Sequence, residues 1–250
     1  MPSRETEHSS LITHHSEVLC TGVIVFPGSN GDHDALYAIG EVLKQPVRAI
    51  WHRETDLDGI DCVVVPGGFS YGDYLRAGAI ARFSPIMAAV EKFANDGGPV
   101  LGICNGFQVI AEANLVPGSL LPNANLEFRS QWVYTRVERT DTPFTSGLAT
   151  GDILKLAVAH GEGRYFVTPD ELARIEANNQ VIFRYCDPSG ELTAESNYNG
   201  ALNNIAGVCN ERRNVVGLMP HPERSAEAIV GSADGKRILE SVLSVVGARV

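Results

Sequence analysis

The sequence predicts an α/β fold built on a mostly parallel β-sheet. Up to residue 113, short apolar runs rich in β-branched residues alternate with helix-like stretches of about ten residues, which is typical of βαβ units. The runs are apolar almost throughout, as strands are when helices cover both faces of a sheet. Because crossover connections are right-handed, these units predict a doubly wound, flavodoxin-like core.

The expected elements follow in chain order. In the core, apolar runs predict strands and the stretches between them predict helices: strands at 22–26, 47–51, 62–65 and 100–103, helices at 34–44, 85–95 and 105–113. After residue 120, strand-like runs separated by turn clusters predict an antiparallel or mixed extension, with strands at 131–138, 153–159, 181–185 and 201–208. An apolar strand at 215–219 and a closing helix at 235–246 complete the chain.

Length and composition narrow the function classes. The chain has 250 residues and a formal net charge of −10, which argues against a duplex nucleic-acid binder, because such proteins present a basic face. No run approaches the roughly 18 apolar residues of a membrane helix, so we expect no membrane span. With no repeat or linker visible, we expect one domain at residues 20–250, after a flexible polar extension at residues 1–19 that is no signal peptide.

The cysteines indicate a reducing compartment. They are five, an odd number, and widely scattered, at positions 20, 62, 104, 186 and 209. No C-x-x-C pair or Cys/His cluster resembles a metal site, so we expect no metal in this chain. We therefore expect a cytoplasmic protein whose cysteines are mostly core thiols.

Cys104 is the first candidate functional residue. It lies in Gly102-Ile103-Cys104-Asn105-Gly106, directly after an apolar strand and directly before a helix. Glycines on both sides tolerate the strained turn of a nucleophile elbow, and the helix start offers unpaired N–H groups that favour a thiolate. A cysteine at the end of an apolar strand can also be a buried, inert core residue, so other segments have to decide.

Two further strand ends carry unusual segments. Gly67, Gly68 and Phe69 follow the strand at 62–65, where backbone N–H groups could form an oxyanion hole, although Pro-Gly-Gly also favours an ordinary turn. His221 follows the strand at 215–219, between two prolines that forbid helix and fix the direction of the ring. Glu223 could orient that imidazole. Ligands of open α/β sheets bind beyond such strand ends, so the sequence predicts a Cys–His–Glu triad.

These residues resemble a known family. The Cys104 elbow together with Pro220-His221-Pro222-Glu223 resembles class I, triad-type glutamine amidotransferases. Three further segments, at 25–32, 67–78 and 160–164, resemble the glutaminase subunits of phosphoribosylformylglycinamidine synthase, and the similarity runs from about residue 21 to the C-terminus. The resemblance implies that Cys104 attacks glutamine, that His221 and Glu223 serve it, and that the N–H groups of Asn105 and of Gly68 or Phe69 hold the oxyanion.

The resemblance also suggests further site residues. Gln108 lies one helical turn after Cys104 and could reach glutamine, or could be an ordinary helical glutamine. The remaining candidates could line the rim of the glutamine site or face a partner, or could be ordinary surface and turn residues: Tyr71, Asp73, Arg76, Arg129, His160, Glu162 and Arg164.

The absence of an ATP-binding motif bears on the partners that we expect for this chain. The sequence contains no G-x-x-x-x-G-K-[ST] motif, so no ATP-binding pattern accompanies the triad. The resemblance implies no cofactor in this chain, with ATP and magnesium used by a separate PurL-like synthetase chain, to which a small PurS-like chain forms the bridge. Open alternatives are the glutaminase of another amidotransferase, a DJ-1/PfpI-like cysteine hydrolase or chaperone, and a non-catalytic interaction module on the same fold.

Overall fold

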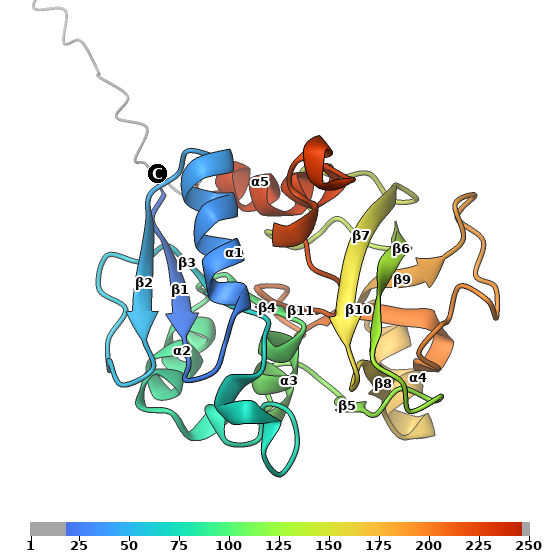
Figure 1. Ribbon diagram of the computed structural model, residues 1–250, viewed down its shortest axis with the longest axis horizontal. Coiled ribbons are helices and arrows are strands. Elements are labelled where there is room, and N and C mark those ends of the chain that lie inside the picture. Colours follow the sequence, from blue (N-terminus) through green and yellow to red (C-terminus); the bar gives the residue numbers. More distant parts are fainter. Residues whose placement is uncertain (1–18, 247–250) are drawn as a thin grey trace, which may run out of the picture.

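The computed structural model describes residues 19–246 and contains a nine-stranded mixed sheet (Figure 1). Its strand order is β2-β1-β3-β4-β11-β10-β9-β6-β7. The parallel half comprises β1 (Thr21–Val25), β2 (Val47–Trp51), β3 (Cys62–Val65), β4 (Val100–Ile103) and β11 (Val215–Leu218). The antiparallel half comprises β6 (Arg129–Val137), β7 (Ile153–His160), β9 (Val181–Cys186) and β10 (Ile205–Cys209). The expected parallel core with an antiparallel or mixed extension is thus confirmed.

Helices cover the parallel half on both faces. The α1 helix (Gly31–Tyr37), which continues as a π-helical turn over Ala38–Val42, lies beside α5 (Asp234–Val246), whereas α2 (Pro85–Asn95) and α3 (Asn105–Glu112) lie on the other side (Figure 1). The four residues of each of β3, β4 and β11 are all buried, which explains their unbroken apolar sequence. No helix within residues 19–246 is long and apolar enough to cross a membrane.

The register of the central strands brings three loops together. Val65 of β3 pairs with Gly102 of β4, and Ile103 of β4 pairs with Leu218 of β11. The three strands therefore end side by side, and the chain that follows each of them enters the same region. These are the Gly67-Gly68, Cys104 and His221 segments that the strand-end rule selects.

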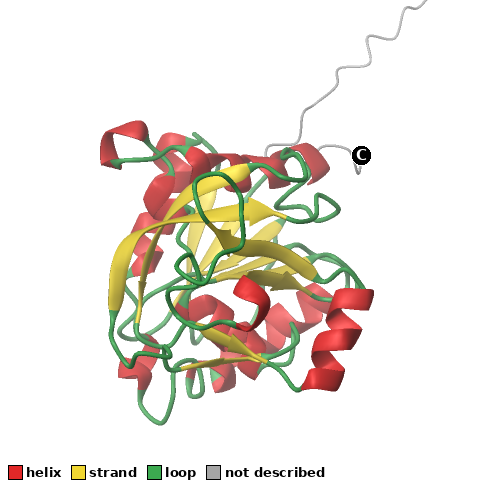
Figure 2. Cartoon of the chain, turned by 90° about the vertical axis from the view of Figure 1, so that its right-hand side faces the viewer, coloured by secondary structure: helices red, strands yellow, loops and turns green. Residues whose placement is uncertain are grey.

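The antiparallel half curls back over these strand ends. The sheet is strongly curved rather than flat (Figure 2). Ala157 of β7, at the far edge of the strand order, forms an isolated antiparallel bridge with His221. The extension is therefore one wall of the region where the parallel strands end.

Some elements differ from the expected ones. The helix expected at 34–44 begins at Gly31, and the strand expected at 201–208 begins only at Ile205, because Leu202–Asn204 form a 3₁₀ turn with positive φ at Asn203 and Asn204. Elements that were not expected are α4 (Pro169–Ala177) and the two-stranded sheet of β5 (Ser119–Leu121) and β8 (Arg164–Phe166). Of the expected extension at 1–19, all but residue 19 lies outside the described residues.

Candidate active site

Cys104 occupies a strained elbow between β4 and α3. Its φ of 49° and ψ of −106° are unusual for a residue with a side chain, and it is 4% exposed. A Cβ at Gly106 would overlap the carbonyl oxygen of Val65, and one at Gly102 would lie 2.8 Å from the carbonyl oxygen of Gly106. Both glycines are therefore required by close backbone approach, as the elbow pattern predicts.

His221 and Glu223 form a buried pair beside this elbow. His221 Nδ1 lies 2.5 Å from Glu223 Oε1, and each side chain is 1% exposed. Burial by itself lowers the pKa of His221, but the Glu223 carboxylate and the Cys104 sulfur outweigh it and raise that pKa above its ordinary value. Because Nδ1 faces Glu223, Nε2 is the ring nitrogen of His221 that is left to exchange protons.

Gly67 lies against both His221 and Cys104, and the absence of a side chain there leaves them room. A Cβ on Gly67 would lie 2.7 Å from His221 Cε1 and 3.5 Å from Cys104 Cβ. The imidazole and the cysteine therefore border one small space at the ends of β3, β4 and β11. The structure brings together the three residues that the sequence predicts as the triad.

The antiparallel half is bonded to both Cys104 and His221. The backbone N–H of His221 donates to Ala157 O at 2.8 Å, and the Cys104 thiol donates to Ala159 O at 3.7 Å. Ser225 Oγ donates to His221 O at 2.9 Å and accepts the N–H of Ala157 at 3.0 Å. Strand β7 and the loop after β11 are thereby fixed to one another at the site.

Two backbone segments can supply N–H donors for an oxyanion. Asn105 is the first residue of α3, where N–H groups lack a partner within the helix. The carbonyl of Gly67 accepts the N–H of Gly31 at 3.1 Å. Because a peptide is planar and trans, the N–H of Gly68 then points the opposite way, away from α1.

The side chain of Asn105 links several of the expected residues. Its Nδ2 donates to Asp73 Oδ1 at 3.0 Å and to Gln108 Oε1 at 2.9 Å, and its Oδ1 accepts the N–H of Ser70 at 3.0 Å. Gln108 Nε2 donates to Glu162 O at 2.6 Å. Burial, and then the charge of Glu162, raise the pKa of Asp73 to about 6, although the bond from Asn105 acts in the opposite sense.

His160 is held inside the protein rather than free in the site. Its Nδ1 lies 3.1 Å from Asn123 Oδ1, and its Nε2 lies 2.6 Å from the Tyr198 hydroxyl. Burial, and then the charge of His221, lower the pKa of His160 to about 3, so it is neutral at physiological pH. Its geometry is that of a structural hydrogen-bonding residue next to the triad.

The other rim candidates differ in exposure and partners. The Tyr71 hydroxyl is bonded inward, 2.8 Å from His52 Nδ1 and 2.9 Å from Ser84 Oγ, whereas Phe69 is 45% exposed and stacks on Phe128. Arg76 forms a bidentate ion pair with Glu112 at the end of α3.

The two remaining arginines begin strands. Arg129 lies opposite His160 in the β6–β7 register and is ion-paired with Glu127 at 3.1 Å, while Arg164 begins β8.

Several residues that support the site were not predicted from the sequence. Asn123 donates to His160 O, and its Oδ1 accepts from Gly163 N. Tyr198, Asn123 and Ser225 have no local motif. Only the Ser225 position, two residues after Glu223, could have been suspected from the sequence.

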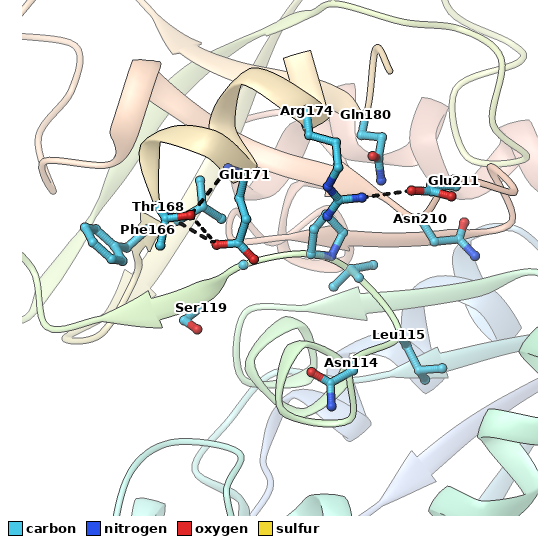
Figure 3. Close-up of a pocket in the computed structure, with 14 residues that line it drawn as sticks. Asn114, Leu115, Ser119, Phe166, Thr168, Glu171, Arg174, Gln180, Asn210 and Glu211 are labelled. Carbon is cyan, nitrogen blue, oxygen red and sulfur yellow. Dashed lines mark hydrogen bonds and ion pairs between the residues drawn. The ribbon is translucent and has the colours of Figure 1, made fainter. Parts of the chain in front are cut away.

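The polar cavity in Figure 3 lies away from the triad. It has a volume of about 550 Å³ and is lined by the loop after α3, the start of α4 and the turn between β10 and β11. Arg174 pairs with Glu211 across it, and Thr168 and Glu171 form the reciprocal N-cap of α4. Among residues 19–246, no group of three or more His, Cys, Asp and Glu side chains is arranged to hold a metal ion.

Comparison with known proteins gives a consistent result. Residues 20–240 match the CobB/CobQ-like glutamine amidotransferase domain. Phosphoribosylformylglycinamidine synthase subunit PurQ of Thermomicrobium roseum is 61% identical over 223 residues, which cover 89% of this chain and 94% of that protein. PurQ of Koribacter versatilis is 53% identical over 91% of this chain and 99% of that protein.

Solved structures agree with this likeness. A chain of the PurLQS structure from Thermotoga maritima superposes with a TM-score of 0.80 at 38% identity, covering 91% of this chain and 99% of that one. A protein described as a putative GMP synthase component, from Thermoplasma acidophilum, shares the fold at 18% identity and a TM-score of 0.61, over 92% of this chain and 96% of that one.

Proposed function

The chain belongs to the glutamine amidotransferase family, and from that membership we propose that it is the glutaminase subunit of phosphoribosylformylglycinamidine synthase. It hydrolyses glutamine to glutamate and ammonia, and the ammonia serves a PurL-type synthetase subunit in purine biosynthesis. That subunit converts formylglycinamide ribonucleotide (FGAR) to formylglycinamidine ribonucleotide (FGAM). A GMP- or anthranilate-type glutaminase is a poorer match, because the relatives at 52–61% identity are PurQ subunits.

One observation carries the chemistry: the buried His221–Glu223 pair beside the Cys104 elbow. Nucleophilic catalysis by cysteine needs a nucleophile, a base beside it and a group that orients the base. A non-catalytic module has no use for a strained cysteine turn next to a buried ionisable pair, which both cost stability. The geometry therefore supports an enzyme.

In the first step, the Cys104 thiolate attacks the side-chain amide carbon of glutamine. The carbonyl oxygen becomes an oxyanion, which the N–H groups of Asn105 and Gly68 or Phe69 stabilise. One such donor is worth about 3 kcal/mol of barrier. The C–N bond then breaks, His221 gives its proton to the departing nitrogen, and a γ-glutamyl thioester and ammonia remain.

In the second step, His221 accepts a proton from water, and the resulting hydroxide attacks the thioester carbon. The same N–H groups hold the second oxyanion until the C–S bond breaks and glutamate leaves. Glu223 keeps Nδ1 of His221 protonated and stabilises its cation throughout, as the acid of a triad does. Atoms balance as glutamine plus water giving glutamate, ammonia and one proton, which leaves from the new γ-carboxyl group.

The ammonia must pass to a second protein. Ammonium is no nucleophile, so transfer as NH₃ along a sequestered path preserves its reactivity. We place ATP and magnesium in the PurL-type subunit, with a PurS-type subunit completing the complex, and assign no cofactor to this chain. Its five cysteines are free, in keeping with a reducing cytoplasmic setting.

The test is substitution of Cys104 in the assembled complex. Cys104→Ala is expected to abolish FGAM formation from glutamine and to leave FGAM formation from added ammonium salt intact. Cys20→Ala, at a cysteine whose side chain makes no described contact to the site, is the matched control and is expected to preserve both activities. Glutamine hydrolysis that persists in Cys104→Ala contradicts the proposed function.

A further inference from the structure

The side chain of Asn105 has more contacts than its expected role requires. A backbone N–H at this position is independent of the side chain, so any residue other than proline could supply the oxyanion donor. Yet Asn105 is 1% exposed and uses both of its amide hydrogens and its amide oxygen. Burying an amide side chain is unfavourable unless its polar atoms are hydrogen-bonded, so an amide with three buried partners indicates a structural role.

Two of its partners, Ser70 and Asp73, lie in the loop after β3, which also contains the expected oxyanion donors Gly68 and Phe69. Oδ1 of Asn105 accepts the N–H of Ser70, two residues after Gly68, at 3.0 Å, and Nδ2 donates to Asp73 Oδ1 at 3.0 Å. Its third bond, to Gln108, joins the segment to the first turn of α3. One side chain therefore connects the loop after β3 to the residue that follows the nucleophile.

That loop needs an external restraint. Tyr71, Gly72, Asp73 and Leu75 all have positive φ, between 54° and 72°. For a residue with a side chain this conformation costs about 1–2 kcal/mol, so the loop is not in its intrinsically preferred form. Tyr71 fixes it to His52 and Ser84, and Arg76 fixes it to the far end of α3. Asn105 fixes it to the residue that follows Cys104.

We propose that the Asn105 side chain is a positioning residue that sets the distance between the two halves of the oxyanion site. The backbone of Gly68–Ser70 is held against the start of α3 by the amide of Asn105, which itself supplies the other N–H. This inference rests on the proposed glutaminase function. The tetrahedral intermediate is then stabilised through the bonds from Asn105 to Asp73 and Ser70 as well as through the N–H groups at the start of α3.

The test compares Asn105→Ala with Asn214→Ala in the assembled complex. Asn214 is also buried, with two bonds from Nδ2, to Ala94 O and Gly98 O, and one to Oδ1 from Asn210, but it joins α2 to the turn before β11. Asn105→Ala is expected to lower kcat for glutamine-dependent FGAM formation about 10²-fold with KM within about threefold, because a misplacement near 1 Å has that effect. Asn214→Ala is expected to lower Tm with kcat unchanged.

A second readout separates the oxyanion site from the nucleophile. Alkylation of Cys104 by iodoacetamide is a displacement at carbon that develops no oxyanion, so its rate is expected to stay within about threefold of wild type in Asn105→Ala. Ammonium-dependent activity is expected to be unchanged. Equal losses in alkylation and in glutamine turnover, or wild-type kcat, overturn the proposal.

Asp73 supplies the conservative rescue. Asp73→Asn keeps an oxygen that can accept from Asn105 and is expected to retain kcat within about threefold, whereas Asp73→Ala is expected to lose at least tenfold. In the double variant Asn105→Ala/Asp73→Ala, the loss of kcat is expected to be smaller than the product of the two single losses, because both substitutions remove the same Asn105–Asp73 hydrogen bond. Losses of kcat that multiply contradict the proposal. If Asn105→Ala folds poorly, the comparison of Asp73→Asn with Asp73→Ala tests the proposal in its place. If wild-type complex makes no FGAM from glutamine while ammonium supports it, the proposed function itself fails, whatever Asn105 does.

Discussion

Replacement of Gly67 by alanine tests the geometry of the triad with a single methyl group. Its Cβ would lie 2.7 Å from Cε1 of His221, whereas ordinary contacts between carbon atoms begin near 3.5 Å. The imidazole or the loop must therefore move by about 0.8 Å. The φ of Gly67 is not among the positive values, so alanine meets no backbone strain of its own there.

The imidazole cannot yield without breaking other contacts. His221 is bonded through Nδ1 to Glu223, through its N–H to Ala157 O and through its carbonyl to Ser225. A shift near 1 Å in a catalytic group costs about 10²-fold in rate, or about 2.7 kcal/mol of activation free energy. Gly67→Ala is therefore expected to lower kcat for glutamine hydrolysis about 10²-fold.

The assay is glutamate release and FGAM formation by the assembled complex, with Cys104 alkylation as a second measurement. Because His221 activates the sulfur, Gly67→Ala is expected to slow alkylation as well, in contrast to Asn105→Ala. Gly40→Ala, in the π-helical turn where a Cβ would be near only a Val47 methyl, is the control and is expected to retain both rates. Wild-type turnover by Gly67→Ala would refute the assigned proximity of His221 and Cys104.

Three further variants test the surroundings of the triad. Gly106→Ala is expected to yield little folded protein, measured by soluble expression and circular dichroism, because its Cβ would overlap the Val65 carbonyl; recovery of a folded enzyme contradicts this. Ser225→Ala is expected to cost about 2 kcal/mol of unfolding free energy by urea titration, since it leaves a buried N–H and carbonyl without their partner. Asp73→Asn is expected to gain stability relative to wild type as the pH rises from about 4 to about 6. The folded protein, with the pKa of Asp73 raised from 3.8 to about 6, binds more protons there than the unfolded chain, so wild-type stability falls over that range; a pH-independent difference in urea midpoints contradicts this.

The sequence could indicate a candidate site because the rule that selects it is local. A parallel strand is readable from its apolar run, and its end is where a ligand site forms, so Cys104, His221 and the Gly67-Gly68 turn could be selected one strand at a time. That these three strands are neighbours follows from sheet pairing, and β3-β4-β11 is indeed consecutive in the sheet. The structure brings these residues together, and their catalytic roles stay a prediction.

The supporting contacts could not be predicted because they join residues remote in sequence. His160 was singled out as a rim residue, but its partners Asn123 and Tyr198 lie 37 and 38 positions away in irregular segments. The same holds for Asn105 and Asp73, which are 32 positions apart. The α4 helix is different, because Thr168-Pro169-Asp170-Glu171 is a capping box with proline at the first helical position, a local signal that predicts a helix start.

The curvature of the sheet explains why the antiparallel half is inseparable from the chemistry. Cys104 and His221 both follow strands of the parallel half, which by itself resembles a complete doubly wound core. Yet the N–H of His221 is satisfied by Ala157, the Cys104 thiol by Ala159, and the turn after His221 by Ser225 bonding to β7. Because β7 is eight positions from β2 in the strand order and four from β11, only a sheet that curls back can deliver these contacts. A parallel core without β6 and β7 would keep Cys104, His221, Glu223 and the His221–Glu223 bond, but it would lose the bonds from β7 to His221, Cys104 and Ser225, so the extension helps to hold the candidate site.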